Sequence, residues 1–120
     1  MKIIFIAGPF RGDGTAGDQK KNIDRAKQFV NVFINNDIPY YSPHMNIDCE
    51  LVGRIYDANK LSVELNREML DRTDAVAILP NWENSKGTIG EINRAEVSGK
   101  RIFYLDRSNT IEEIKEWIKE

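Results

Sequence analysis

Short apolar runs alternate with longer amphipathic segments along this chain of 120 residues. Runs rich in β-branched and aromatic residues predict four strands, at 2–7, 38–41, 74–79 and 101–105, of which the first and third are expected to be buried. Apolar residues at helical spacing predict helices over about 19–36, 59–72 and 88–99, and a last helix that begins at Thr110. The stretch 45–57 has apolar residues without a clear period, so we interpret it as a loop with at most one helical turn.

Polar residues and glycine mark the ends of these predicted helices. Asp18 is a good candidate cap for the first helix, and Gly99 closes the third. Thr110 and Glu113 have the spacing of a capping box, which predicts that Thr110 caps the last helix.

Strands that alternate with helices predict right-handed crossovers and a single α/β domain over residues 1–120. We expect a doubly wound, flavodoxin- or Rossmann-like fold with a mainly parallel sheet of four to five strands. The strand order 2-1-3-4 places the switch point of the sheet between the first and third strands. Ligands of open α/β sheets bind at that point, so the loops after these two strands are expected to share one cleft.

The segment after the third predicted strand combines a Gly/Ser turn with a carboxylate. It reads Trp-Glu-Asn-Ser-Lys-Gly-Thr-Ile-Gly-Glu over residues 82–91. The free N–H groups of such a turn and the dipole of the following helix favour an anionic ligand, and Glu91 is predicted in the first helical turn. The same residues also match a capping box between Thr88 and Glu91, so a purely structural role is open at this point.

The segment after the first predicted strand holds four of the eight glycines of the chain, within residues 8–17. It is longer than the roughly 2–6 residues that are usual between a strand and a helix. Glycine allows close backbone approach to a ligand, and Arg11 offers a planar fork suited to phosphate or carboxylate. We interpret the segment as a phosphate or ribose clamp, with a flexible surface loop as the alternative.

Composition excludes several classes of function. The formal net charge is −2, which gives no basic field for a polynucleotide, so nucleic-acid binding is not expected. One cysteine and one histidine argue against a disulfide or a zinc site, and we expect no metal and no cofactor. Neither a signal peptide nor an apolar stretch near the ~20 residues of a membrane span is present, so we expect a cytoplasmic protein without a membrane partner.

With both loops in view, the chain resembles the nucleoside 2-deoxyribosyltransferase superfamily, in particular its small nucleotide-hydrolysing members and uncharacterised, often phage-borne, relatives. The resemblance rests on four motifs in order along the chain: residues 5–12, Pro43-His44, residues 74–76 and the Ser-x-Gly-x-x-x-Glu element at 85–91. It implies cleavage of the N-glycosidic bond of a (deoxy)nucleoside 5′-monophosphate, or deoxyribosyl transfer between bases. Glu91 would be the nucleophile and would form a covalent glycosyl-enzyme intermediate.

The resemblance also implies a set of substrate-binding residues. Ser85, Gly87 and Thr88 would hold a 5′-phosphate, while Gly8, Arg11 and Gly12 would line the same cleft. Phe10 is expected beside the base, and His44 is expected near the base or the phosphate. Trp82 is suited either to stack on a base or to cover the core, and both interpretations are open.

Two positions depart from the pattern of active members of the superfamily. Phe5 stands where they carry a tyrosine that hydrogen-bonds the nucleophile, and Asn66 stands where they carry an aspartate that serves the leaving base or the sugar. An amide hydrogen-bonds a sugar hydroxyl but is no general acid near pH 7. The candidates to replace that acid are Asp48, Glu50, Asp57 and Glu64.

These departures leave a second function open, a non-catalytic nucleotide-binding module that senses or sequesters its ligand. A hydrolase that releases a phosphoribosyl group from ribonucleotides is a third. The resemblance further implies a homodimer or larger homo-oligomer, and the candidates for its interface are the 45–57 stretch and Met69.

Overall fold

The computed structural model describes residues 1–46 and 59–120. Four strands form one sheet, β1 (Ile4–Ala7), β2 (Tyr40–Tyr41), β3 (Ala75–Ile78) and β4 (Arg101–Tyr104). Their order is β2-β1-β3-β4, and every neighbouring pair is parallel. The predicted α/β class, the strand order and the doubly wound arrangement are therefore confirmed, with four strands in the sheet.

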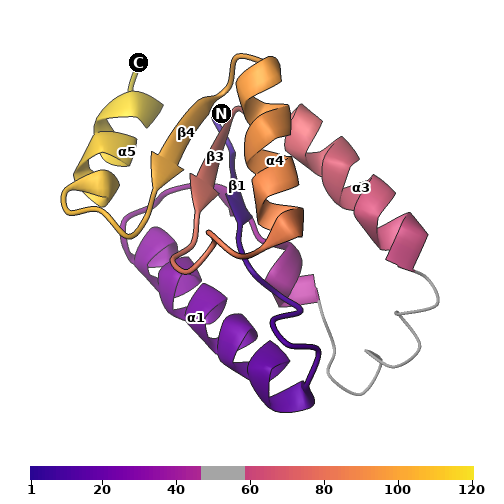
Figure 1. Cartoon of the computed structure of the whole chain (residues 1–120). Helices are drawn as coiled ribbons and strands as arrows, with labels where there is room; N and C mark the ends of the chain where they lie inside the picture. The colour runs from indigo at the N-terminus through magenta and orange to yellow at the C-terminus, as the bar shows by residue number, and fades with distance from the viewer. Residues whose placement is uncertain (47–58) are drawn as a thin grey trace.

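Helices cover both faces of this sheet (Figure 1). The helices of the described residues are α1 (Ala16–Asn35), α3 (Asn59–Arg72), α4 (Lys86–Val97), α5 (Thr110–Ile118) and the short 3-10 helix η1 (Pro43–Asn46). α1 and α5 pack on one face, while α3 and α4 pack on the other. The loops that leave β1 and β3 emerge together at the end of the sheet opposite the N-terminus.

The two faces of the sheet build two separate hydrophobic clusters. Alternate residues of β1 belong to different clusters: Ile4 and Ile6 face α1 and α5, whereas Phe5 and Ala7 face α3 and α4. All four residues are at most 1% exposed. Burial on both faces explains why the central strands are uninterrupted apolar runs in the sequence rather than alternating ones.

The beginnings of two helices differ from their predictions. Thr15, not Asp18, caps α1, and its hydroxyl accepts the Asp18 N–H at 3.1 Å. In α5 the cap position is Asn109, and Thr110 is the first helical residue. The buried Thr110 hydroxyl donates to a backbone carbonyl of the segment that precedes the helix, at 2.7 Å, so its side chain fixes the turn instead of capping the helix.

The end of α4 is set by a glycine, as predicted, although the helix itself begins and ends two residues earlier than expected. Gly99 has a φ of 70°, in the left-handed region. Its N–H donates to the Glu96 carbonyl at 3.1 Å, and the Lys100 N–H donates to the Ala95 carbonyl at 3.0 Å. This pair of bonds is a Schellman motif, which satisfies the last carbonyls of the helix.

Two further predictions concern the surface. Met69, a candidate interface residue, packs partly buried against the cluster under α3 and α4. Of the 45–57 stretch, Met45 and Asn46 end η1, and the remainder lies outside the described residues. Among the described helices, none is both long enough and apolar enough to cross a membrane.

A pair of glycine substitutions tests this account of helix ends. Gly99→Ala should lower the free energy of unfolding by about 1 kcal/mol, because an alanine is strained at positive φ. Gly17→Ala should raise it by about 0.5 kcal/mol, because Gly17 lies inside α1 with open space around its Cα. Urea unfolding of both variants measures the two values. A Gly99→Ala variant that is no less stable than the Gly17→Ala variant would contradict the Schellman motif.

Candidate functional site

A cleft of about 1340 Å³ opens at the carboxyl ends of β1 and β3. It is lined by the loops after β1, β2 and β3 and by parts of α1, α3 and α4. Ten of the residues predicted for the site line this cleft: Gly8, Phe10, Arg11, Gly12, His44, Asn66, Ser85, Gly87, Thr88 and Glu91. The switch point of the sheet therefore gathers motifs from residues far apart in the chain.

The start of α4 supplies one wall of the cleft. Ser85 caps the helix: its Oγ accepts the Thr88 N–H at 3.3 Å and lies 2.8 Å from the Thr88 hydroxyl. The capping-box interpretation of Thr88 and Glu91 is therefore wrong, and Glu91 lies in the second helical turn instead of the first. The N–H groups of Lys86 and Gly87 precede the first intrahelical bond and meet no acceptor in the described part of the chain.

Glu91 is the half-buried carboxyl of this wall. Burial alone raises its pKa to about 7, because the protein replaces the water that would solvate the charge. Among the described residues, no hydrogen bond and no ion pair reaches its carboxyl group. A group with this pKa populates both its neutral and its ionised forms near neutral pH, which is the property of an acid–base or nucleophilic residue.

Two buried side chains hold the loop after β1. His44 is 4% exposed, and its Nε2 donates to the Pro9 carbonyl at 2.9 Å. Asn22 of α1 is 7% exposed, and its Nδ2 donates to the Phe10 carbonyl at 3.0 Å. Burial lowers the pKa of His44, so the imidazole stays neutral, and consecutive carbonyls of the loop are fixed from two different elements.

The tip of this loop closes on a carboxylate of the protein itself. Asp18 Oδ2 accepts the Asp13 N–H at 2.8 Å. Gly12 has a φ of 56°, and a Cβ added there would lie 1.7 Å from the same oxygen. Gly12 is therefore required by this turn, while Gly8 is required by the contact with Leu79, which a Cβ would meet at 2.6 Å.

Sequence reasoning missed three residues of α1 that line the cleft, Asp18, Asn22 and Arg25. Arg25 donates to Asn22 Oδ1 at 3.0 Å, so Asn22 joins Arg25 to the loop after β1. Their spacing of four and three residues places them on one helix face, next to the glycine-rich loop. That spacing could have indicated that the three residues share a site, but it was not used because a polar helix face usually faces solvent.

Trp82 does not line the cleft. Its ring packs against Tyr104, with ring centroids 5.5 Å apart, and covers the cluster under α4. Phe5 is fully buried and stacks on Tyr41 at 5.8 Å, whereas Asn66 lines the cleft. The candidate acid Glu64 is exposed outside the lining, and the other three, Asp48, Glu50 and Asp57, lie outside the described residues.

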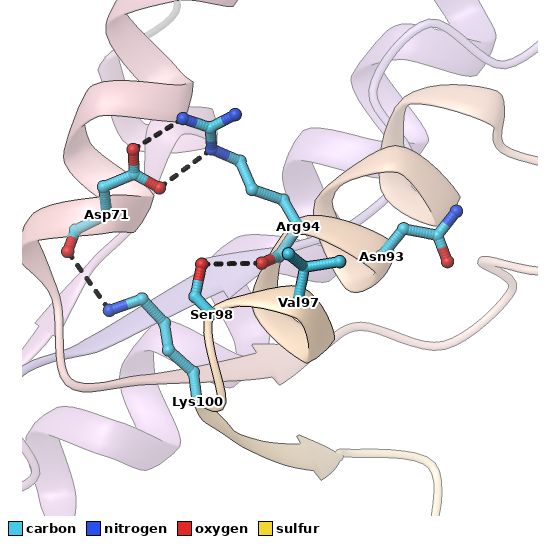
Figure 2. Close-up of a pocket in the computed structure, with 6 residues that line it drawn as sticks. All are labelled: Asp71, Asn93, Arg94, Val97, Ser98 and Lys100. Carbon is cyan, nitrogen blue, oxygen red and sulfur yellow. Dashed lines mark hydrogen bonds and ion pairs between the residues drawn. The ribbon is translucent and has the colours of Figure 1, made fainter.

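An ion pair holds together the two helices that carry Asn66 and Glu91 (Figure 2). Arg94 of α4 and Asp71 of α3 point toward one another, and the guanidinium donates two bonds to the carboxylate, at 2.8 and 2.6 Å. These bonds lower the pKa of Asp71. Lys100 donates to the carbonyls of Asp71 and Thr73, at the end of α3. The shallow hollow between the helices is thus occupied by polar groups that satisfy one another.

No group of three or more histidine, cysteine, aspartate or glutamate side chains suited to a metal ion occurs within the described ranges 1–46 and 59–120.

Comparisons with known proteins place residues 2–105 within a family model described as "Domain of unknown function (DUF7768)". Curated proteins with local similarity include DNA topoisomerase 2-beta of Homo sapiens and of Cricetulus longicaudatus, each 49% identical over 59 residues. The mouse (Mus musculus) protein of the same name is 48% identical over 59 residues. The aligned segment covers 48% of this chain but only 3–4% of the length of these relatives.

The raised pKa of Glu91 predicts a specific pH dependence of stability. The carboxyl is protonated more readily in the folded state than in the unfolded chain, so its contribution to the free energy of unfolding should fall as the pH rises from about 4.5 to about 7. The Glu91→Gln variant has no titrating group at this position and should lack this contribution. The pH-dependent change in the free energy of unfolding should therefore differ between the two proteins by an amount on the order of 3 kcal/mol. Urea unfolding of both proteins between pH 4.5 and 8 measures it, and parallel curves would contradict the burial of Glu91.

Proposed function

The chain belongs to the family described as a domain of unknown function, DUF7768, and we propose that its cleft binds a nucleoside or nucleotide whose N-glycosidic bond Glu91 cleaves. The observation that carries the proposal is the position of Glu91, a half-buried carboxyl with a pKa of about 7 in a cleft at the switch point. Because Ser85 caps the helix, Glu91 has no structural task at its start.

The start of α4 supports a phosphate on the ligand. The N–H groups of Lys86 and Gly87 and the Ser85 hydroxyl stand at the positive end of the helix dipole. Glu91 follows within the next helical turn, at a rise of about 1.5 Å per residue. A 5′-phosphate at the helix start therefore leaves the sugar within reach of the carboxyl.

The proposed reaction proceeds in two displacements. A carboxylate oxygen of Glu91 attacks C1′ of the sugar, the C1′–N bond breaks, and its electron pair leaves with the base, which takes up a proton. The resulting glycosyl ester is attacked at C1′ by water, which loses a proton as the ester bond breaks and the carboxylate returns. The sum is nucleotide and water to free base and sugar phosphate, and a second base in place of water gives transfer. A covalent intermediate divides one difficult displacement into two easier ones.

The described walls of the cleft supply no separate carboxylic acid to protonate the leaving base. Apart from Glu91, Asp18 is the one carboxyl in the lining formed by the described residues, and it accepts a loop N–H. Asn66 is an amide and serves better as a hydrogen-bond partner of a sugar hydroxyl. The base then takes its proton from water, which favours substrates whose base leaves easily.

A binding module that does not cleave its ligand is the second candidate. It is favoured by Phe5, which is buried against Tyr41 and has no group to donate to Glu91. A nucleophile without a hydrogen-bonding partner is partly protonated near pH 7, which lowers the reactive fraction. In this function the same cleft holds the nucleotide and releases it unchanged.

Incubation with a panel of ribo- and deoxynucleoside 5′-monophosphates tests the proposal. The wild type should release free base from at least one of them, followed by chromatography, and Glu91→Ala should reduce that rate by about 10³-fold or more. The rate should increase as the pH rises through about 7, because the ionised carboxylate is the nucleophile.

Glu96→Ala is the matched control, since Glu96 is an exposed carboxylate of the same helix outside the cleft. It should retain the wild-type rate. Thermal shifts are read on the same samples: stabilisation by a nucleotide without base release in any protein would overturn the enzymatic proposal and support the binding module.

A further inference from the structure

The net charge of the side chains that line the cleft is opposite in sign to the net charge of the whole chain. The formal net charge of the chain is −2. The cationic side chains in the lining are Arg11, Arg25, Arg67, Lys86 and Arg94, against the carboxyls of Asp18 and Glu91. A cleft lined by an excess of one charge concentrates ligands of the opposite charge.

The two carboxyls in the cleft offset only part of this excess. Asp18 is engaged by the Asp13 N–H at 2.8 Å, and no ion pair joins it to a cation in the described part of the chain. Glu91 has a pKa of about 7, so it carries only a fraction of a negative charge near neutral pH. Arg94 is balanced by Asp71. Arg25, Arg67 and Lys86 have no carboxylate partner among the residues that the structure describes.

Two of these cations belong to helices on opposite faces of the sheet (Figure 1). Lys86 is the first residue of α4, at its positive end, and meets no acidic partner among the described residues. Arg25 belongs to α1 and is partly buried; its guanidinium donates to the neutral Asn22 amide oxygen at 3.0 Å, with no carboxylate partner in the described ranges. That bond to Asn22 orients Arg25 without neutralising it.

The size of the cleft agrees with a ligand larger than a mononucleotide. Its volume of about 1340 Å³ exceeds the roughly 300–1,000 Å³ of typical small-molecule sites. A nucleoside monophosphate has one phosphate, which the start of α4 would hold. Such a ligand would have no second anionic group to pair with Arg25.

We infer that the ligand of this cleft is a nucleotide with at least two phosphate groups, one held at the start of α4 with Lys86 and another by Arg25. The inference rests on the proposed function, because it concerns the substrate of the same site. Two sources share this chemistry: a mononucleotide with two phosphates, and a dinucleotide whose nucleosides are joined through a pyrophosphate.

Calorimetric titration at fixed ionic strength tests the inference with four ligands of one base and sugar: the 5′-monophosphate, the 5′-diphosphate, the 3′,5′-bisphosphate and the pyrophosphate-linked dinucleotide. At least one ligand with two phosphates should bind about tenfold or more tightly than the monophosphate, the ratio given by about 1.4 kcal/mol from a charge-assisted bond. Which of them does so distinguishes the two sources.

Substitutions assign the preference to its residues. Arg25→Gln should reduce the ratio between the best doubly phosphorylated ligand and the monophosphate to about threefold or less. Lys86→Gln should weaken the binding of both ligands and leave this ratio largely unchanged, because Lys86 contacts the phosphate that they share. Lys27→Gln is the matched control, because Lys27 is an exposed cation of α1 outside the cleft, and it should leave the ratio unchanged.

The outcomes separate this inference from the proposed function. Equal affinity of the wild type for mono- and doubly phosphorylated ligands overturns the inference and leaves the proposed function in place. A preference that Lys27→Gln reduces as much as Arg25→Gln also overturns it, since the preference would then come from net charge. Failure of all four ligands to bind overturns the proposed function and the inference together.

Discussion

Direct pairing of β1 with β3 joins Ile4 to Ala75 and Ala7 to Ile78, and the site depends on that pairing. Both strands are buried on both faces, so their register is fixed by the packing of two hydrophobic clusters. The chain leaves the ends of these strands at one edge of the sheet, toward opposite faces. The cleft is therefore a consequence of the strand order, and residues distant in sequence become its walls.

The same packing sets the chemistry of Glu91. The carboxyl lies on the helix that follows β3, and the walls that shape the cleft also remove water from it, which raises its pKa to about 7. Stability is lost when this group ionises, and in the proposed reaction the same ionisation produces the nucleophile. The ion pair between Asp71 and Arg94 joins α3 to α4, the two helices that line the cleft from this face of the sheet.

Much of the fold was predictable because its signals are local or follow from burial. Uninterrupted apolar runs identified the strands, and glycine at position 99 identified the end of a helix. Helix starts were predicted less well, since several residues able to cap stand close together: Thr88 is nearly fully buried, and Ser85 takes the cap. Tertiary packing decides between such residues, and the sequence pattern does not contain it.

For the site, too, the sequence predicted what depends on local pattern and missed what depends on tertiary contacts. Most predicted residues line one cleft because they belong to loops after adjacent strands. Trp82 does not, because its environment is formed by Tyr104 on another strand. Asn22 was missed because its role depends on the Phe10 carbonyl, which only the folded loop brings within 3.0 Å. Contacts between distant segments were therefore the part that sequence reasoning could not supply.

The central claim is that Glu91 forms a covalent bond to the sugar, and mass spectrometry after a rapid acid quench during turnover tests it most directly. Cleavage after Lys86 and Arg94 by trypsin yields the peptide 87–94, in which Glu91 is the one carboxyl side chain. The account predicts that this peptide gains the mass of one sugar phosphate residue. Release of base while the peptide keeps its unmodified mass, with the sugar absent or attached elsewhere, would contradict it.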